Sequence, residues 1–341
     1  MSETSRMSRF PETGLLPLVA QGHERRPVRV TALGGGHGLY GSLSALKLIT
    51  TALTAVVTVA DDGGSSGKLR EELDVLPPGD LRMALSALCD DTDWGRTWRD
   101  VMQHRFTSSS ADRPTALENH ALGNLLIVTL WELLQDPIAG LDWAGALLNA
   151  RGRVLPMATD PLIIEGDIVS KNEHGVTFRD TVQGQARLAQ AGRVDKVRLL
   201  PEDVVACPDA VRAVHEADWV VLGPGSFFTS LLPHLLLPGL RDAVLATTAQ
   251  TCLVMNLELD GNETRGMSAA DHLLVLRDYV PEIRVNTVIA DPTAVGERGT
   301  FEDVAAQLGA TVLWASVAES DQPGVHDPLK LAAAYKQVFK G

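Results

Sequence analysis

The sequence is short of cysteine and has no long apolar run. Only Cys89, Cys207 and Cys252 occur among 341 residues. Their odd number and wide spacing predict neither a disulfide framework nor a zinc site. No apolar run reaches the ~18 residues that a membrane helix needs, since the best candidate, residues 122–134, contains Asn124 and Glu132. We therefore expect a cytoplasmic protein without a membrane span.

Positive charge is also scarce, because the chain has 30 Lys and Arg residues but 43 Asp and Glu residues, which gives a net charge of −13. This balance argues against nonspecific binding to nucleic acid or to an anionic membrane. It does not argue against a small phosphorylated ligand, which backbone amides at a helix N-terminus can hold on an acidic protein.

The chain is predicted to form one domain preceded by a tail. Residues 1–27 are polar and rich in proline, and their apolar stretch, 14–20, is interrupted by Pro17 and follows no basic region. We interpret them as a flexible N-terminal tail and not as a signal peptide. The sequence is 45% hydrophobic, so residues 28–341 can bury a large core.

From residue 28 onward, buried-strand patterns alternate with helix patterns. Strands are predicted at 28–33, 55–60, 219–223, 243–249 and 252–257, and helices at 39–48, 81–88, 117–134, 227–237, 269–279 and 328–339. This alternation is typical of an α/β fold with a doubly wound, mainly parallel sheet. The polar, strand-like segment 166–190 predicts a small antiparallel insertion around 163–200.

A glycine-rich loop follows the first predicted strand. It contains Gly34 and Gly35 and continues as Gly36-His37-Gly38-Leu39-Tyr40-Gly41, which matches G-x-G-x-x-G between a strand and a helix. Such a loop lets a phosphate reach backbone amides and the positive end of a helix. A tight turn without any ligand is the alternative.

A second loop combines two acids with glycine and serine after the strand at 55–60. Its residues are Asp61, Asp62, Gly63, Gly64, Ser65 and Ser66. The two acids could bind ribose hydroxyls or Mg²⁺, and the serines could donate to phosphate. An Asp N-cap beside a solvated loop is the alternative.

Two helix starts carry further polar candidates. Asp80 follows a Pro-Pro-Gly turn and stands at a natural N-cap position, so capping and ligand binding both remain open. His120 could donate a proton or contact an oxyanion, although a lone histidine is more often structural. Asn124 is a polar residue in a leucine-rich helix.

Another glycine loop follows the strand at 219–223. It consists of Gly223, Pro224, Gly225 and Ser226, with Thr229 one turn further on. Two such loops at strand ends indicate one ligand in the crevice between them. Asn256, Glu263 and Thr264 could line the same crevice or belong to an ordinary loop.

Several long blocks resemble the YvcK family of gluconeogenesis factors, which is related to the CofD 2-phospho-L-lactate transferases. The blocks run in order from about residue 28 to 279 and read GGGHGL, TVADDGGSSGKLREEL, PPGDLR, HALGNLL, VVLGPGSFFTSLLPHLL and ET-x-G. Residues 281–341 are less diagnostic.

The resemblance implies a Rossmann-like, three-layer α/β/α fold and binding of UDP-sugars such as UDP-N-acetylglucosamine. It also implies support of cell shape and of cell-wall precursor supply, with an enzyme of amino-sugar synthesis as the partner and no firmly attached catalytic activity. The resemblance also implies that the residues matching the family's motifs by position bind the ligand. These are the first glycine loop, residues 61–66, Asn124 and residues 223–226. His37 stands where the family has threonine, and Met267 stands where it has a tyrosine linked to UDP-sugar binding.

Three functions remain open at this point. The first is a nucleotide-sugar-binding regulator that requires no cofactor. The second is a transferase in which Asp61 and Asp62 hold Mg²⁺ and His120 assists a proton transfer. The third is an NAD-dependent oxidoreductase, for which no hydride-transfer constellation is evident, although NAD or another nucleotide could occupy the crevice. A homo-oligomer is compatible with all three.

Overall fold

The computed structural model describes residues 26–108, 115–171, 177–259 and 261–340, so residues 1–25 of the predicted tail lie outside it. The main sheet has seven strands in the order β10-β9-β8-β7-β1-β2-β3, and all its neighbouring strands are parallel. The strands are β1 (Val30–Gly34), β2 (Leu53–Val57), β3 (Arg153–Pro156), β7 (Trp219–Leu222), β8 (Gln250–Val254), β9 (Thr287–Ala290) and β10 (Thr311–Trp314).

The strand order confirms the doubly wound α/β prediction. The chain builds the sheet outward from β1 through β2 to β3, and then returns to the other side of β1 with β7 and continues outward to β10. The order therefore reverses between β1 and β7, and this is the point at which open α/β sheets bind ligands. Every residue of β1 and β7 is buried, as expected for parallel strands covered on both faces.

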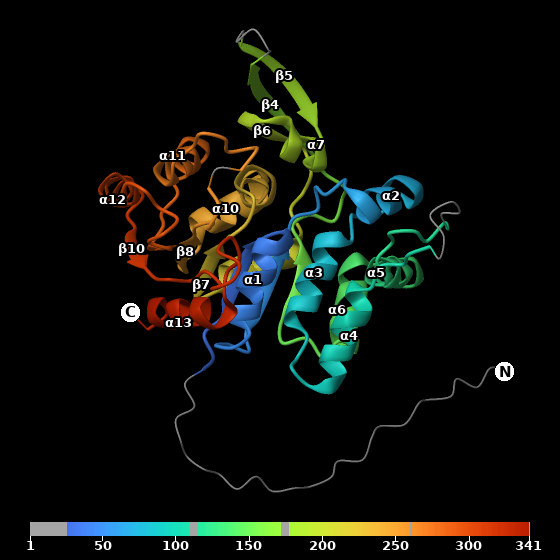
Figure 1. The fold of residues 1–341 in the computed structure, drawn as a ribbon. Coiled ribbons are helices and arrows are strands. Elements are labelled where there is room, and N and C mark those ends of the chain that lie inside the picture. Colours follow the sequence, from blue (N-terminus) through green and yellow to red (C-terminus); the bar gives the residue numbers. More distant parts are fainter. Residues whose placement is uncertain (1–25, 109–114, 172–176, 260, 341) are drawn as a thin grey trace, which may run out of the picture.

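Helices cover both faces of this sheet (Figure 1). Helix α1 (Gly36–Leu46) packs between α3 (Gly79–Leu88) and α13 (Pro328–Val338), and α8 (Pro208–Glu216) packs against α10 (Pro238–Ala246). Leu39, Leu43 and Leu46 of α1 are buried, because positions three and four residues apart share one helix face.

The remaining helices complete the layers and the chain connections. They are α2 (Gly64–Leu73), α4 (Asp93–Gln103), α5 (Leu122–Leu134), α6 (Pro137–Leu147), α7 (Gln185–Ala191), α9 (Leu232–Leu236), α11 (Ala269–Tyr279), α12 (Arg298–Gln307) and the π-helical turn η1 (Phe227–Leu231). Within the described ranges, no helix combines the length and the apolar character that crossing a membrane would demand.

The predicted antiparallel insertion is confirmed. Strands β4 (Ile163–Lys171), β5 (Thr177–Gln183) and β6 (Arg193–Leu200) form a separate sheet in the order β5-β4-β6. The predicted segment also includes residues 172–176, which lie outside the described residues. The small sheet projects from one end of the main sheet, with α7 at its base (Figure 1).

Several predicted elements need correction. Residues 243–249 are not a strand, because α10 continues to Ala246 and buries Leu240, Ala243 and Val244 at helical spacing. The helix predicted from residue 117 begins only at Leu122, after an extended N-cap at Ala121. The helix predicted at 227–237 is divided into η1 and α9.

Neither proposed Asp cap is present. The N-cap of α2 is Gly63, and the N-cap of α3 is Pro78, which places Asp80 inside the first turn of that helix.

Candidate functional site

The two glycine loops meet at the reversal point of the sheet. One follows β1 and the other follows β7, its hydrogen-bonded neighbour. A Cβ atom at Gly38 would lie 2.4 Å from the Pro224 carbonyl oxygen and 2.5 Å from the Gly225 Cα. Side chains are therefore absent at Gly38 because the two backbones pack together. The first loop is part of a rigid double-loop structure before any ligand arrives.

Asn256, just beyond β8, clamps the second loop. Its Oδ1 accepts a hydrogen bond from the Gly225 amide at 2.8 Å, and its Nδ2 donates to the Gly225 carbonyl at 2.8 Å. Both backbone groups of one glycine are thus satisfied by one side chain. The ends of β1, β7 and β8 are joined into one unit, so Asn256 lies where the sequence predicted it.

Glu263 supports the same loop from beneath. Its carboxylate accepts hydrogen bonds from Ser226 Oγ at 2.6 Å, Thr229 Oγ1 at 3.3 Å and the Phe228 amide at 3.4 Å. Burial raises the pKa of Glu263, and these donors partly offset that rise. Glu263 and Thr229 thus hold the start of η1, where a negative charge is favoured.

Thr264 closes its own turn, because its hydroxyl donates to the Leu259 carbonyl at 2.7 Å and accepts from the Gly261 amide at 3.1 Å. It is buried and does not line the hollow beside the loops. Thr264 and Glu263 therefore stabilise the surrounding loops without lining the crevice.

A hollow of about 540 Å³, here called the crevice, opens beside the double loop. It is lined by His37, Gly38, Tyr40, Gly41, Pro224, Gly225, Ser226, Asn256, Leu257, Glu258, Glu319, Gln322, Gly324, Val325, His326 and Pro328. No lysine or arginine occurs among these described lining residues. An anionic group in the crevice would therefore rely on backbone amides and on the N-terminus of α1.

Residues 319–326, here called the strap, form one wall of the crevice. The strap is held at its ends, where the Glu319 amide donates to the Val325 carbonyl at 2.8 Å and the Asp327 amide donates to Val317 at 2.8 Å. The Asp291 carboxylate accepts from the Val317 amide at 2.8 Å. From sequence alone, residues 281–341 could cover the crevice or form an interface, because no glycine loop or strand-end acid marks the strap.

His326 is the strap residue set deepest in the crevice wall. It is only 9% exposed, and its Nε2 atom has no hydrogen-bond partner among the described residues. Burial lowers the pKa of His326 to about 4, despite opposing contributions from the Met255 backbone and Asp291. The imidazole is therefore neutral near pH 7.

The diacid loop separates its two carboxylates. Asp61 accepts hydrogen bonds from the Gly63 amide at 2.9 Å and from Ser66, whose Oγ in turn accepts from the Gly79 amide at 3.0 Å. Burial raises the pKa of Asp61. Asp62 instead accepts from the Ala186 amide of α7 at 2.9 Å. Ser66 thus belongs to a buried connection to α3 and does not face the crevice.

Asp80 lies directly beneath the first glycine loop. A Cβ atom at Gly35 would lie 2.6 Å from Asp80 Oδ2, and the Gly36 amide donates to the Asp80 carboxylate. Burial, reinforced by the charge of Asp61, raises the pKa of Asp80 to about 7. Its Oδ2 atom has no partner within the described part of the chain, which suits a carboxyl group that keeps its proton near neutrality.

His120 and Asn124 meet at Ser65 in a buried network. Ser65 Oγ accepts from Asn124 Nδ2 at 3.0 Å and from the Ala121 amide at 3.4 Å, and it lies 3.1 Å from His120 Nδ1. Because both amides are donors, the single hydroxyl proton is directed to Nδ1. Arg82 Nε donates to Asn124 Oδ1 at 2.9 Å. These predicted site residues come together, but none of them lines the crevice.

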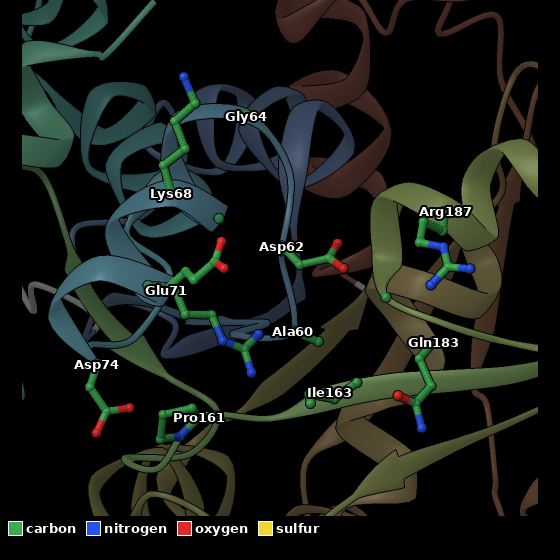
Figure 2. A pocket seen from close by; sticks show the side chains of 13 residues that line it. Ala60, Asp62, Gly64, Lys68, Glu71, Asp74, Pro161, Ile163, Gln183 and Arg187 are labelled. Carbon is green, nitrogen blue, oxygen red and sulfur yellow. The ribbon is translucent and has the colours of Figure 1, made fainter. Parts of the chain in front are cut away.

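Asp62 and Gly64 line a different, larger hollow of about 800 Å³ between α2 and the small sheet, here called the side hollow (Figure 2). Its lining shares no residue with that of the crevice. The single site predicted from sequence is thus divided into two hollows.

Met267 lies away from both. It lines a further hollow of about 360 Å³ beside α12 and is 7% exposed. From sequence, Met267 is expected beside the glycine loops, but it lines neither the crevice nor the side hollow.

The described residues contain no cluster of three or more His, Cys, Asp or Glu side chains able to hold a metal ion. Asp61 accepts hydrogen bonds from Gly63 and Ser66 at the start of α2, whereas Asp62 accepts from Ala186 of α7. A magnesium ion bound through both would have to displace the hydrogen bonds that each already makes.

Comparisons with known proteins extend over nearly the whole chain. The family model described as 2-phospho-L-lactate transferase CofD matches residues 30–320. A Mycobacterium tuberculosis relative is 49% identical over 313 residues, covering 91% of this chain and 90% of its own. The gluconeogenesis factor of Listeria monocytogenes is 37% identical over 286 residues, covering 84% of each chain.

A solved structure agrees with these relatives. The crystal structure of a UPF0052 family member from Bacillus halodurans superposes with a TM-score of 0.79 at 32% identity. The match covers 91% of this chain and 99% of that one. The described fold and the sequence relationships therefore point to the same group of proteins.

Proposed function

Because the chain belongs to the YvcK family of gluconeogenesis factors and is matched by the CofD family model, we propose that it binds a nucleotide sugar in the crevice and acts as a regulator. The ligand class we propose is a UDP-sugar, with UDP-N-acetylglucosamine as its representative. The observation that carries the proposal is the double loop, in which two strand-end glycine loops pack together at the reversal point of a doubly wound sheet.

The diphosphate is assigned to the first turn of α1. This helix begins at Gly36, and its N-cap, Gly35, offers no side-chain cap to the first-turn amides. The Gly36 amide already donates to Asp80, so a phosphate would use the amides that follow it, together with the partial positive charge of the helix N-terminus. His37 and Gly38 of this turn line the crevice, so the ligand can approach the turn from that side.

The hydroxyl-bearing parts of the ligand are assigned to the other wall. Glu258 and Glu319 line the crevice, and carboxylates accept hydrogen bonds from ribose or sugar hydroxyls. The neutral imidazole of His326 forms part of this wall, although its unpartnered Nε2 is buried. A crevice with acceptors and without lysine or arginine favours a neutral sugar over a second strongly anionic group.

Regulation would follow because the two walls of the crevice come from different segments of the chain. One wall consists of the glycine loops and Asn256, and the other is the strap. A ligand that contacts both walls favours the conformation in which they lie close, and a regulator responds through such a difference in affinity between states. A partner enzyme of amino-sugar synthesis, and support of cell shape and cell-wall precursor supply, are the outputs we propose.

A magnesium-dependent transferase is the second candidate, because the matching family model is described as a 2-phospho-L-lactate transferase. The buried carboxyl group of Asp80 beneath the first glycine loop, with Asp61 nearby, is the feature that favours it. Charge stabilisation around a diphosphate would then supply the catalysis.

Calorimetric titration of the purified chain tests the proposal. The ligands are UDP-N-acetylglucosamine, UDP-glucose, GDP and NAD, each with and without Mg²⁺, and every sample is then analysed for products. We expect UDP-sugar binding without turnover. Preference for GDP, or a magnesium-dependent product, would favour the transferase instead.

Asn256→Asp tests the location of the ligand. This change keeps the acceptor to the Gly225 amide but removes the donor to the Gly225 carbonyl and adds a charge. Leaving the Gly225 carbonyl without its donor in this part-buried loop costs about 1–3 kcal/mol, so UDP-sugar affinity should fall roughly 5- to 150-fold. Asn262→Asp, an equal change at an exposed position, is the matched control. Equal affinity in the two variants would remove the double loop from the site.

A further inference from the structure

The side hollow has the features of a ligand site of its own. It lies between α2, the beginning of β4, the end of β5 and α7, at the junction of the main body and the small sheet. Its volume of about 800 Å³ exceeds the 540 Å³ of the crevice. A pocket of this size at the junction of two structural units can bury a small ligand.

Two arginines in the side hollow are free to bind an anion. Arg70 and Arg187 line it, and within the described ranges neither side chain makes a hydrogen bond or an ion pair. By contrast, Arg153 on the main sheet binds both Asp142 and Asp209. Arg70 is also half-buried, and burial lowers its pKa. The nearby charges of Asp62, Asp61 and Asp74 partly offset that change without forming an ion pair.

The other lining residues suit a neutral polyol. In Figure 2 the cavity separates Glu71 and Asp74 on one side from Gln183 and Arg187 on the other. Glu71, Asp74 and Gln183 can exchange hydrogen bonds with hydroxyl groups. Ile163, which is 40% exposed, and Pro161 provide an apolar surface for the face of a sugar ring.

The charges in the lining balance. Lys68, Arg70 and Arg187 supply three positive charges, and Asp62, Glu71 and Asp74 supply three negative ones. A single phosphate on a hydroxyl-rich body matches this mixture, because the guanidinium groups bind phosphate oxygens while the carboxylates accept from hydroxyls. A ligand with several phosphates would meet the carboxylates at close range.

We propose that the side hollow is a second binding site, separate from the crevice, for a phosphorylated sugar, with Arg70 and Arg187 binding the phosphate. Its occupancy would join α2 to α7 beside the Asp62–Ala186 hydrogen bond, and would thereby fix the small sheet against the main body. This proposal does not depend on the nucleotide sugar in the crevice.

Calorimetric titration with glucose 6-phosphate, inorganic phosphate and glucose tests it. We expect glucose 6-phosphate to bind the full chain more tightly than inorganic phosphate, and glucose to give no measurable heat. Arg187→Gln should weaken glucose 6-phosphate binding at least tenfold, since a charged hydrogen bond contributes about 1.5–3 kcal/mol. Arg187 is exposed, so its replacement leaves the fold intact. Arg284→Gln, which removes an equally exposed arginine outside the lining, should leave the affinity unchanged.

Results of two kinds would overturn the proposal. One is an absence of glucose 6-phosphate binding, or equal binding in the Arg187→Gln and Arg284→Gln variants. The other is loss of UDP-N-acetylglucosamine binding in Arg187→Gln, or displacement of UDP-N-acetylglucosamine by glucose 6-phosphate, because the two ligands would then share one site. Failure of UDP-sugar binding alone would contradict only the function proposed for the crevice.

Discussion

At the scale of single residues, Gly38 lies where two backbones come closest. We predict that Gly38→Ala will lower the free energy of unfolding by about 1–3 kcal/mol, the usual cost of overpacking, and will abolish UDP-sugar binding. The added methyl group would lie 2.4 Å from the Pro224 oxygen, so the loops must separate. Urea unfolding and calorimetric titration measure the two effects.

Gly41→Ala is the matched control, because a Cβ atom there meets its nearest neighbour, His326 Cβ, at 3.8 Å. Gly41 lies inside α1, where alanine is favoured over glycine by about 0.5–1 kcal/mol. We expect unchanged or slightly increased stability. A Gly38→Ala protein as stable as the control would show that the double loop is not close-packed.

Asp80 should give stability a distinctive pH dependence. Burial raises the pKa of Asp80 in the folded protein to about 7, so between pH 4 and 7 the folded state binds a proton that the unfolded state has released. Stability is therefore greatest below the unfolded pKa and falls as pH rises to about 7, by up to ~4 kcal/mol. We predict that Asp80→Asn removes this fall, as measured by urea unfolding between pH 4.5 and 8.

Glu72→Gln, which removes an exposed carboxylate from α2, controls for the loss of one negative charge. Parallel pH profiles for the wild-type and Asp80→Asn proteins would mean that Asp80 is ionised throughout this range.

At the scale of elements, α13 fixes the strap by packing against α1. Ser42 Oγ and Tyr335 Oη are 2.7 Å apart, and both residues are fully buried. We predict that Tyr335→Phe lowers the free energy of unfolding by about 1–3 kcal/mol, because Ser42 loses its buried partner. Ser42→Ala combined with Tyr335→Phe should cost less than the sum of the single changes.

Urea unfolding of the four proteins in this cycle measures the coupling. Tyr40→Phe is a matched control on α1, since the Tyr40 hydroxyl makes no hydrogen bond within the described part of the chain. Strictly additive costs would show that the two hydroxyls act independently.

The elements that sequence predicted well are those whose local pattern agrees with their burial. The run from 28 to 33 is mainly apolar, with Arg29 and Thr31 as its polar members, and every residue of β1 is buried, so pattern and environment largely coincide. The segment 243–249 misled the prediction because its apolar and β-branched residues suit a strand. Its first residues instead complete a helix begun at Pro238, which packs on α8, and tertiary packing overrides local propensity.

The candidate site was predictable to the extent that motifs mark it. The glycine loops and Asn256 follow strand ends, and the carboxyl ends of neighbouring parallel strands meet at one edge. The strap could not be predicted, because Glu319 and His326 reach the crevice only through contacts with remote segments such as Asp291. The division into two hollows likewise depends on where the small sheet lies, and no local pattern specifies that position.

At the scale of the whole molecule, the crevice draws on segments spread over most of the chain. Its lining begins at His37 and ends at Pro328. Contacts between such distant segments form only when the intervening chain has also folded, and they add to the entropic cost of reaching the native state.

This spread has a consequence during synthesis on the ribosome. The double loop needs residues up to Asn256 and the strap needs residues up to His326, so a growing chain has no complete crevice until His326 has emerged. The ligand proposed for the crevice would therefore stabilise, by mass action, only molecules in which both walls have formed. The cellular level of such a ligand would then affect how long each molecule with a complete crevice survives proteolysis.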